Sequence, residues 1–193
     1  MEESQEQEID KITRQVGLLM KEKGYKGFFG LDFLIEDETG EVYLSENNAR
    51  LTASSSFYTT LELMEGSFPL LGYHLLSFLS SLVVESIYSP PLISGSEIVV
   101  RNNLTAPIKV VESFSPGLYN EKLEFKEKVF SLEKAGTSDL LLEAASEGRI
   151  VNPEIELAKI NCLETVCGKN GQLNEKYLEL VKAVKEKLVL EKC

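Results

Sequence analysis

Alternating apolar and polar residues on both sides of a short turn predict a β-hairpin early in the chain. In residues 29–35 every second position carries a large apolar side chain, and residues 42–45 alternate in the same way. A period of two residues around a turn that contains glycine is typical of two antiparallel strands. Residues 38–40 are expected to form a three-residue loop, with Gly40 in the left-handed conformation of a bulge turn.

The turn also fixes the register of the hairpin. The expected pairs are Asp37 with Glu41, Leu34 with Leu44, and Asp32 with Glu46. Opposite residues share a face, with Cβ atoms about 4.5–5.5 Å apart, and Asn48 joins that face if the strand continues. Like charges there destabilise a sheet unless a cation neutralises them, and Mg²⁺ prefers oxygen ligands. A slip of one residue would remove Asp32 from this face, and the alternative is a hairpin with two solvated acids.

Two segments of the hairpin, GLDF at residues 30–33 and VYLSENNAR at residues 42–50, resemble the metal-binding hairpin of the ATP-grasp superfamily. Its members include biotin carboxylase, carbamoyl-phosphate synthetase and amino-acid ligases, and their pattern is roughly G-x-D/E-F, a turn, then E-x-N-x-R. The resemblance implies that Asp32, Glu46 and Asn48 bind the Mg²⁺ (or Mn²⁺) ions that bridge the phosphates of ATP. It implies that Arg50 meets the transferred phosphate or the acyl-phosphate, and that residues 51–55 form the substrate-side loop.

The activity implied by the resemblance is an ATP-dependent carboxylate–amine ligase, which activates a small carboxylate substrate as an acyl-phosphate. One departure is Asn47-Asn48-Ala49, where many relatives have an apolar residue, Asn and Pro. The family holds ATP between two subdomains, and the lysine-bearing N-terminal half is the expected partner, in the same parent chain or as a separate subunit. This chain alone is then expected to be inactive. The alternative is a non-catalytic binding or regulatory module that acts through a protein partner.

Helical periodicity predicts helices on either side of the hairpin and at the end of the chain. The expected helices span residues 5–23, residues 59–64 with a threonine cap, residues 70–84 after Pro69, and residues 174–190. Gly24 is a stop signal for the first helix. Asn174 is the expected cap of the last helix, whose buried stripe is expected to include Leu178, Val181, Val184 or Lys185, and Leu188. In relatives, a helix like the first one packs beside the metal hairpin.

The second half of the chain has a different pattern. Short strands are expected at residues 97–100, 108–113, 122–125, 140–144 and 155–160, separated by Asn, Pro and Gly. Such punctuation predicts a small β-rich subdomain that ends in a helix. Residues 88–96 are rich in Pro, Gly and Ser and predict a loop or linker. The predicted fold class is therefore α+β, with the C-terminal subdomain of an ATP-grasp domain at residues 1–92 and the β-rich subdomain at residues 93–193.

Composition narrows the choice of partners and compartment. The net charge is −11, with 31 acidic and 20 basic residues, which argues against a nucleic-acid or anionic-membrane surface. The apolar residues 68–88 are interrupted by polar residues and proline, so no membrane span is expected. The polar N-terminus and three cysteines predict a reduced, cytoplasmic setting. Cys162 and Cys167 are expected to be buried or half-buried thiols, and His74, the single histidine, is expected to be a packed or surface residue and not a base.

Overall fold

The computed structural model describes residues 2–79, 91–168 and 170–193, and the chain divides into two compact units. Unit 1 is Met1–Pro91 and unit 2 is Leu92–Cys193. This division lies next to the expected one after residue 92. Helices are combined with antiparallel sheets, which confirms the expected α+β class.

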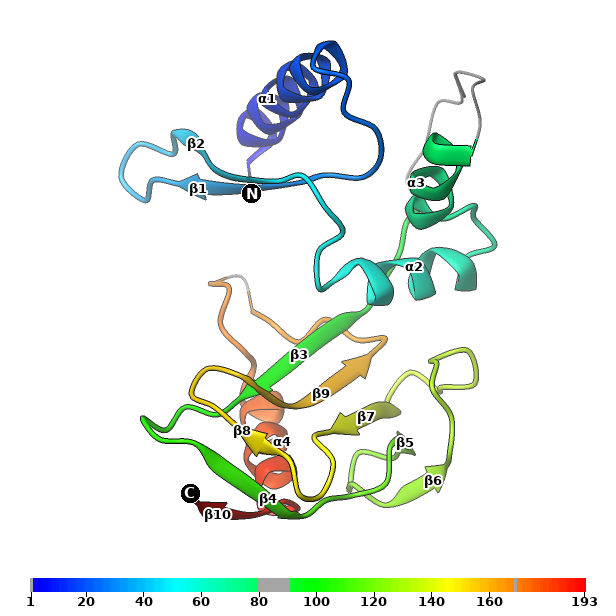
Figure 1. Ribbon diagram of the computed structural model, residues 1–193, viewed down its shortest axis with the longest axis vertical. Coiled ribbons are helices and arrows are strands. Elements are labelled where there is room, and N and C mark those ends of the chain that lie inside the picture. The colour runs from blue at the N-terminus through cyan, green and yellow to red at the C-terminus, as the bar shows by residue number, and fades with distance from the viewer. Residues whose placement is uncertain (1, 80–90, 169) are drawn as a thin grey trace. The chain divides into compact units, whose positions relative to one another are not determined.

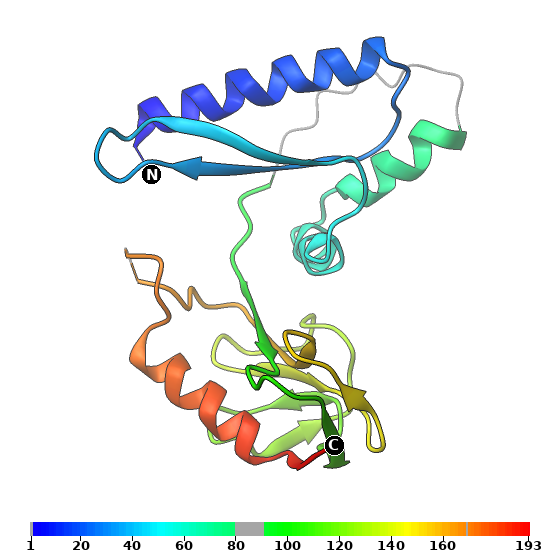
Figure 2. The ribbon, with the colours of Figure 1, turned by 60° about the vertical axis from the view of Figure 1, so that its left-hand side comes forward.

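Unit 1 is built around the predicted hairpin. Its elements are α1 (Glu3–Glu22), β1 (Gly30–Ile35), β2 (Val42–Asn48), α2 (Ser55–Met64) and α3 (Leu70–Leu79). Helix α1 lies along the hairpin (Figures 1 and 2), as the resemblance implied. Gln5 donates from Nε2 to the carbonyl of Gly40 at 3.2 Å, and Asn47 donates from Nδ2 to Sδ of Met20 at 3.4 Å. These contacts fix the helix against one face of the hairpin and leave the other face open.

The register of the hairpin differs from the expected one near the turn. The amide of Glu36 donates to the carbonyl of Glu41 at 3.0 Å, so the loop has four residues, 37–40, and the expected pairing of Asp37 with Glu41 is wrong. Leu34 consequently lies opposite Tyr43 and not opposite Leu44. Gly40 does adopt the expected left-handed conformation, with φ of +74°.

A β-bulge at Ser45 then restores the expected register. Asp32 lies opposite Glu46 while the next residue, Phe33, lies opposite Leu44, so Ser45 is the extra residue on β2. In an unbroken strand, Leu44 and Glu46 would share one face, because side chains alternate with a period of two. The bulge separates them, and Leu44 joins the face of Phe33 while Glu46 keeps the face of Asp32.

Of the two short helices after the hairpin, the first differs from expectation. Helix α2 begins at Ser55, so Thr59 and Thr60 lie inside the helix and do not cap it. Helix α3 begins at Leu70 as expected and is described to Leu79, and the rest of its expected span lies outside the described residues. The fully buried carboxylate of Glu62 accepts the amide of Leu70, at 3.1 and 3.2 Å from its two oxygens. A carboxylate at this helix start satisfies a free amide and favours the positive end of the helix dipole.

Unit 2 contains the main hydrophobic core. Its elements are β3 (Ser96–Arg101), β4 (Ile108–Glu112), β5 (Gly117–Tyr119), β6 (Phe125–Glu127), β7 (Leu140–Ala144), β8 (Ile150–Val151), β9 (Glu156–Cys162), α4 (Glu175–Glu186) and β10 (Val189–Lys192). The strands form a five-stranded sheet of order β3-β9-β7-β5-β6 and a three-stranded sheet of order β10-β4-β8. Helix α4 packs on the larger sheet, where Tyr177, Leu180 and Val184 join a core with Leu142 and Ile160.

Four of the five expected strands are present, and the one at residues 122–125 is wrong. The side-chain oxygen of Asn120 accepts the amides of Lys122 and Glu124, both at 3.0 Å, which folds residues 120–124 into a turn. Strand β6 therefore begins only at Phe125. This local side-chain bond competes with the strand ladder, which is how Asn commonly interrupts regular structure.

The last helix is shorter than predicted, and one residue of its predicted buried stripe is exposed. It ends at Glu186, because residues from Val189 onward pair with β4. Its buried residues are Tyr177, Leu180 and Val184, whereas Leu178 is 48% exposed, so the predicted stripe is correct at Val184 and wrong at Leu178. Asn174 does occupy the cap position, but its side chain makes no capping hydrogen bond.

Candidate functional site

The candidate site is the open face of the hairpin. Asp32 on β1 and Glu46 on β2 lie directly opposite each other, as expected, and both are exposed. Neither carboxylate forms an ion pair within the described part of the chain. Two adjacent negative charges without a cationic partner favour binding of a cation on this face.

Asn48 at the end of β2 and Arg50 just after the strand extend the site through a chain of hydrogen bonds. Asn48 donates from Nδ2 to Oδ2 of Asp32 at 3.2 Å, across the hairpin. Arg50 donates from Nη2 to Oδ1 of Asn48 at 3.0 Å. The amide of Asn48 therefore joins the guanidinium to the carboxylate and positions both, and all four predicted site residues lie in one neighbourhood.

The oxygen atoms of this face suit a hard divalent cation. Asp32 and Glu46 offer carboxylate oxygens, and Oδ1 of Asn48 keeps a second lone pair beside its bond to Arg50. Magnesium prefers such ligands and completes its shell with water and phosphate oxygens. No group of three or more His, Cys, Asp or Glu residues suited to a metal is found in the described ranges, so a metal here would need the amide oxygen as well.

The loop after the hairpin is held by its own hydroxyl groups. The amide of Thr52 donates to Oγ of Ser55 at 3.0 Å, and Oγ1 of Thr52 lies 3.2 Å from Oγ of both Ser54 and Ser55. Gly30 lies beside this loop, where a Cβ atom would come within 3.1 Å of the Thr52 methyl group. The hydroxyl-rich segment thus serves as a turn that leads into α2 and packs on the start of β1.

A hollow beside Arg50 contains residues that the sequence did not connect with the hairpin. It has a volume of about 680 Å³ and is lined by Lys26 and His74 as well as Arg50. His74 is half-buried, and its Nδ1 atom accepts the amide of Phe28 at 3.0 Å. No sequence motif links residues 26, 50 and 74, and only the packing of α3 against the segment before β1 brings them together.

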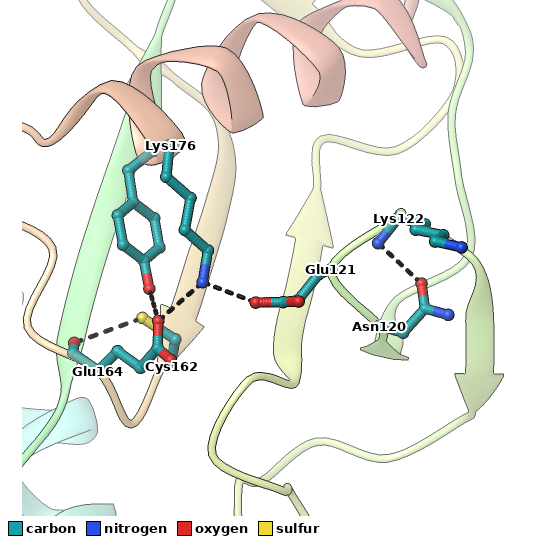
Figure 3. Close-up of polar contacts among 7 residues, drawn as sticks. Asn120, Glu121, Lys122, Cys162, Glu164 and Lys176 are labelled. Carbon is teal, nitrogen blue, oxygen red and sulfur yellow. Dashed lines mark hydrogen bonds and ion pairs between the residues drawn. The ribbon is translucent and has the colours of Figure 1, made fainter.

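Unit 2 holds a second polar cluster, between α4 and the loop after β9 (Figure 3). Lys176 binds Glu121 at 2.7 Å and Glu164 at 3.0 Å, and Tyr177 donates its hydroxyl to Glu164. Cys162 donates from Sγ to the carbonyl of Glu164 at 3.6 Å. Burial raises the pKa of the Cys162 thiol, so this sulfur stays protonated and is a poor nucleophile. The cluster fastens α4 to the sheet and offers no reactive group.

The three cysteines are free thiols, and they differ in exposure. Cys162 is buried as expected, whereas Cys167 and Cys193 are exposed, so the expectation of a buried or half-buried thiol is wrong for Cys167. Within the described residues, the helices are too short or too polar to cross a membrane.

Comparisons with known proteins give no family for this chain: no family model matches it, and a search of curated proteins found no match.

Proposed function

We propose that unit 1 supplies the magnesium- and ATP-binding hairpin of an ATP-grasp ligase. The observation that carries this proposal is the pairing of Asp32 with Glu46 on the open face, with Asn48 and Arg50 joined to it by hydrogen bonds. A bulge and a longer loop offset each other to keep the two acids opposite. A hairpin with two merely solvated acids has no need of that arrangement.

The proposed reaction activates a small carboxylic acid. A carboxylate oxygen bonds to the γ-phosphorus of ATP while the bond to the β–γ bridging oxygen breaks, which gives an acyl-phosphate and ADP. An amine then attacks the acyl carbon, phosphate leaves with the bonding electron pair, and the amine loses a proton. Bound Mg²⁺ would neutralise the phosphate charge during the first step.

The site residues divide into two roles in this proposal. Asp32, Glu46 and Asn48 would hold the metal through oxygen atoms. Arg50 would bind the acyl-phosphate through its planar guanidinium, which suits two oxygens of one anion. Because Arg50 also bonds Asn48, its guanidinium is already oriented beside the metal ligands. Such phosphoryl transfer depends on position and charge, so a protein base is not required.

We further propose that the lysine-bearing half of the ATP-grasp domain, in the same protein or a separate subunit, completes the site. Among the described residues of unit 1, Leu61 is the one buried apolar side chain, while Leu34 is 62% exposed and Tyr43 50% exposed on the open face. These apolar groups beside the acids suit a surface that closes over a nucleotide. The three free thiols fit a reduced, cytoplasmic setting for this assembly.

Binding of Mn²⁺ to the purified chain, followed by the electron paramagnetic resonance signal of free Mn²⁺, tests the proposal. The double variant Asp32→Asn, Glu46→Gln should bind Mn²⁺ at least about tenfold more weakly, which is about 1.4 kcal/mol. The matched control is Asp37→Asn, Glu38→Gln, which removes the same charge from the exposed loop of the hairpin. Equal loss in both double variants, or no loss in either, would contradict a metal site on the open face.

A second arm separates the ligase from a non-catalytic module. ADP should strengthen Mn²⁺ binding by the wild-type chain, because the phosphates add metal ligands. Co-expression with an ATP-grasp N-terminal half should then give ATP hydrolysis that the Asp32→Asn, Glu46→Gln variant lacks. Metal binding without hydrolysis in any such pair would favour the module.

A further inference from the structure

The hollow beside Arg50 has walls of two different kinds. Lys26, Arg50 and His74 supply polar groups, and Tyr25 and Phe78 supply aromatic surface. All of its lining residues belong to unit 1. A pocket of this size with an apolar wall and a few converging polar groups is typical of a small-molecule site.

The charge of this hollow is opposite to that of the protein. The chain has 31 acidic residues against 20 basic ones, yet the described residues that line the hollow include two cationic side chains and no carboxylate. Within the described ranges, neither Lys26 nor Arg50 forms an ion pair. Two cationic side chains that line one hollow without an acidic partner favour an anionic ligand.

His74 is oriented to add a hydrogen-bond donor. Its Nδ1 atom accepts the amide of Phe28 at 3.0 Å, so the proton of the neutral ring is on Nε2. An edge-to-face contact with Phe78, with centroids 5.1 Å apart, also holds the ring. Gly27 permits this close approach, because a Cβ atom there would come within 2.6 Å of Nδ1. The imidazole is thus held as a fixed donor by the backbone that precedes β1.

We propose that this hollow binds the carboxylic acid that the ligase activates, and that the acid has an aromatic or branched apolar body. The proposal rests on the proposed function for its substrate role. Arg50 belongs to both sites, since it lines the hollow and bonds Asn48 of the metal site. Lys26 and the Nε2 group of His74 bind the carboxylate with Arg50, and Tyr25 and Phe78 contact the body. Lys26 and His74 therefore determine the substrate, a role outside the hairpin motif.

Saturation-transfer NMR on the full chain without nucleotide tests this with 3-phenylpropionate as the probe. The acid should show transfer from the protein, and its neutral amide, 3-phenylpropanamide, should show little. Lys26→Gln should weaken binding at least about fivefold, and Lys21→Gln, which removes a nearby exposed charge outside the hollow, should leave it within about twofold. His74→Asn should also weaken binding, because asparagine can still accept the Phe28 amide but lacks the Nε2 donor.

Each opposite result overturns the proposal. Equal transfer to the amide would show an apolar surface only, and equal loss in Lys26→Gln and Lys21→Gln would show an effect of net charge only. Displacement of the acid by inorganic phosphate as readily as by excess acid would assign the hollow to phosphate groups. The Asp32→Asn, Glu46→Gln variant should still bind the acid. If the chain binds Mn²⁺ but not the acid, the substrate site is overturned and the proposed ligase function is not. If the chain binds the acid but not Mn²⁺, the proposed ligase function is overturned.

Discussion

Asp32 and Glu46 lie opposite each other across the hairpin even though the strand register changes beside them. The loop is one residue longer than the sequence pattern indicated, which by itself would shift every pair on β2. The bulge at Ser45 takes up that residue, so the shift ends before Glu46. The bulge also puts Leu44 on the face of Phe33 and leaves the acids together on the open face.

Asn48 is predicted to matter more for metal binding than its neighbour Asn47. Asn48→Ala removes an oxygen ligand and the link between Arg50 and Asp32, so we expect Mn²⁺ affinity to fall about tenfold, or about 1.4 kcal/mol. Asn47→Ala is the control, because Asn47 contacts Met20 of α1 on the other face. Titration of Mn²⁺ against both variants checks this, and equal effects would contradict the assignment of the two faces.

The stability of unit 2 is predicted to depend on the ionised form of Glu164. The Tyr177 hydroxyl and the Lys176 ammonium lower the pKa of this carboxyl. Because folding lowers this pKa, the ionised carboxylate stabilises the folded state at any pH above the pKa of the unfolded chain, near 4.5. That stabilisation is lost as the pH falls through the lower pKa of the folded protein. Glu164→Gln should lower the free energy of unfolding by about 1–2 kcal/mol at neutral pH. This difference from wild type should shrink below the unfolded pKa.

Urea denaturation, monitored by hydrogen exchange at the amides of β9, measures this change in the free energy of unfolding. Glu121→Gln is the control, because Glu121 is the other acidic partner of Lys176. Both side chains of this ion pair are about half exposed. Such a pair contributes about 0–1 kcal/mol. A constant deficit of Glu164→Gln at every pH would show that the ionised carboxylate does not account for its effect.

The buried thiol is predicted to be inert in the folded protein. Burial raises the pKa of Cys162, whereas Cys167 and Cys193 are exposed. A thiol reagent such as dithionitrobenzoate should modify Cys167 and Cys193 quickly and Cys162 only after unfolding, because the thiolate is the reactive form. Mass spectrometry of the labelled peptides identifies the sites. Rapid labelling of Cys162 under native conditions would show that β9 opens readily.

The buried face of α4 can be tested with two leucines. Leu180 is 8% exposed in the core, and Leu178 is 48% exposed. Leu180→Ala should destabilise unit 2 by about 2–5 kcal/mol through lost burial and a cavity. Leu178→Ala should change the free energy of unfolding by about 0.5 kcal/mol or less. Chemical denaturation of both variants measures the two changes in the free energy of unfolding. A larger change for Leu178→Ala would support the buried stripe predicted from periodicity.

The sequence by itself determined the α+β class, the hairpin and its two acids, because strand alternation, helix periodicity and turn residues act over short distances. Local spacing also predicted which charged residues share one face of the hairpin. Tertiary structure decided which face of α4 is buried, since Tyr177 and Leu178 are both apolar enough and only the sheet beneath selects between them. It also decided the bulge at Ser45, because this bulge offsets a loop one residue longer than the local pattern indicates. The meeting of Lys26, Arg50 and His74 depends on packing between segments distant in the chain, and no local pattern encodes it.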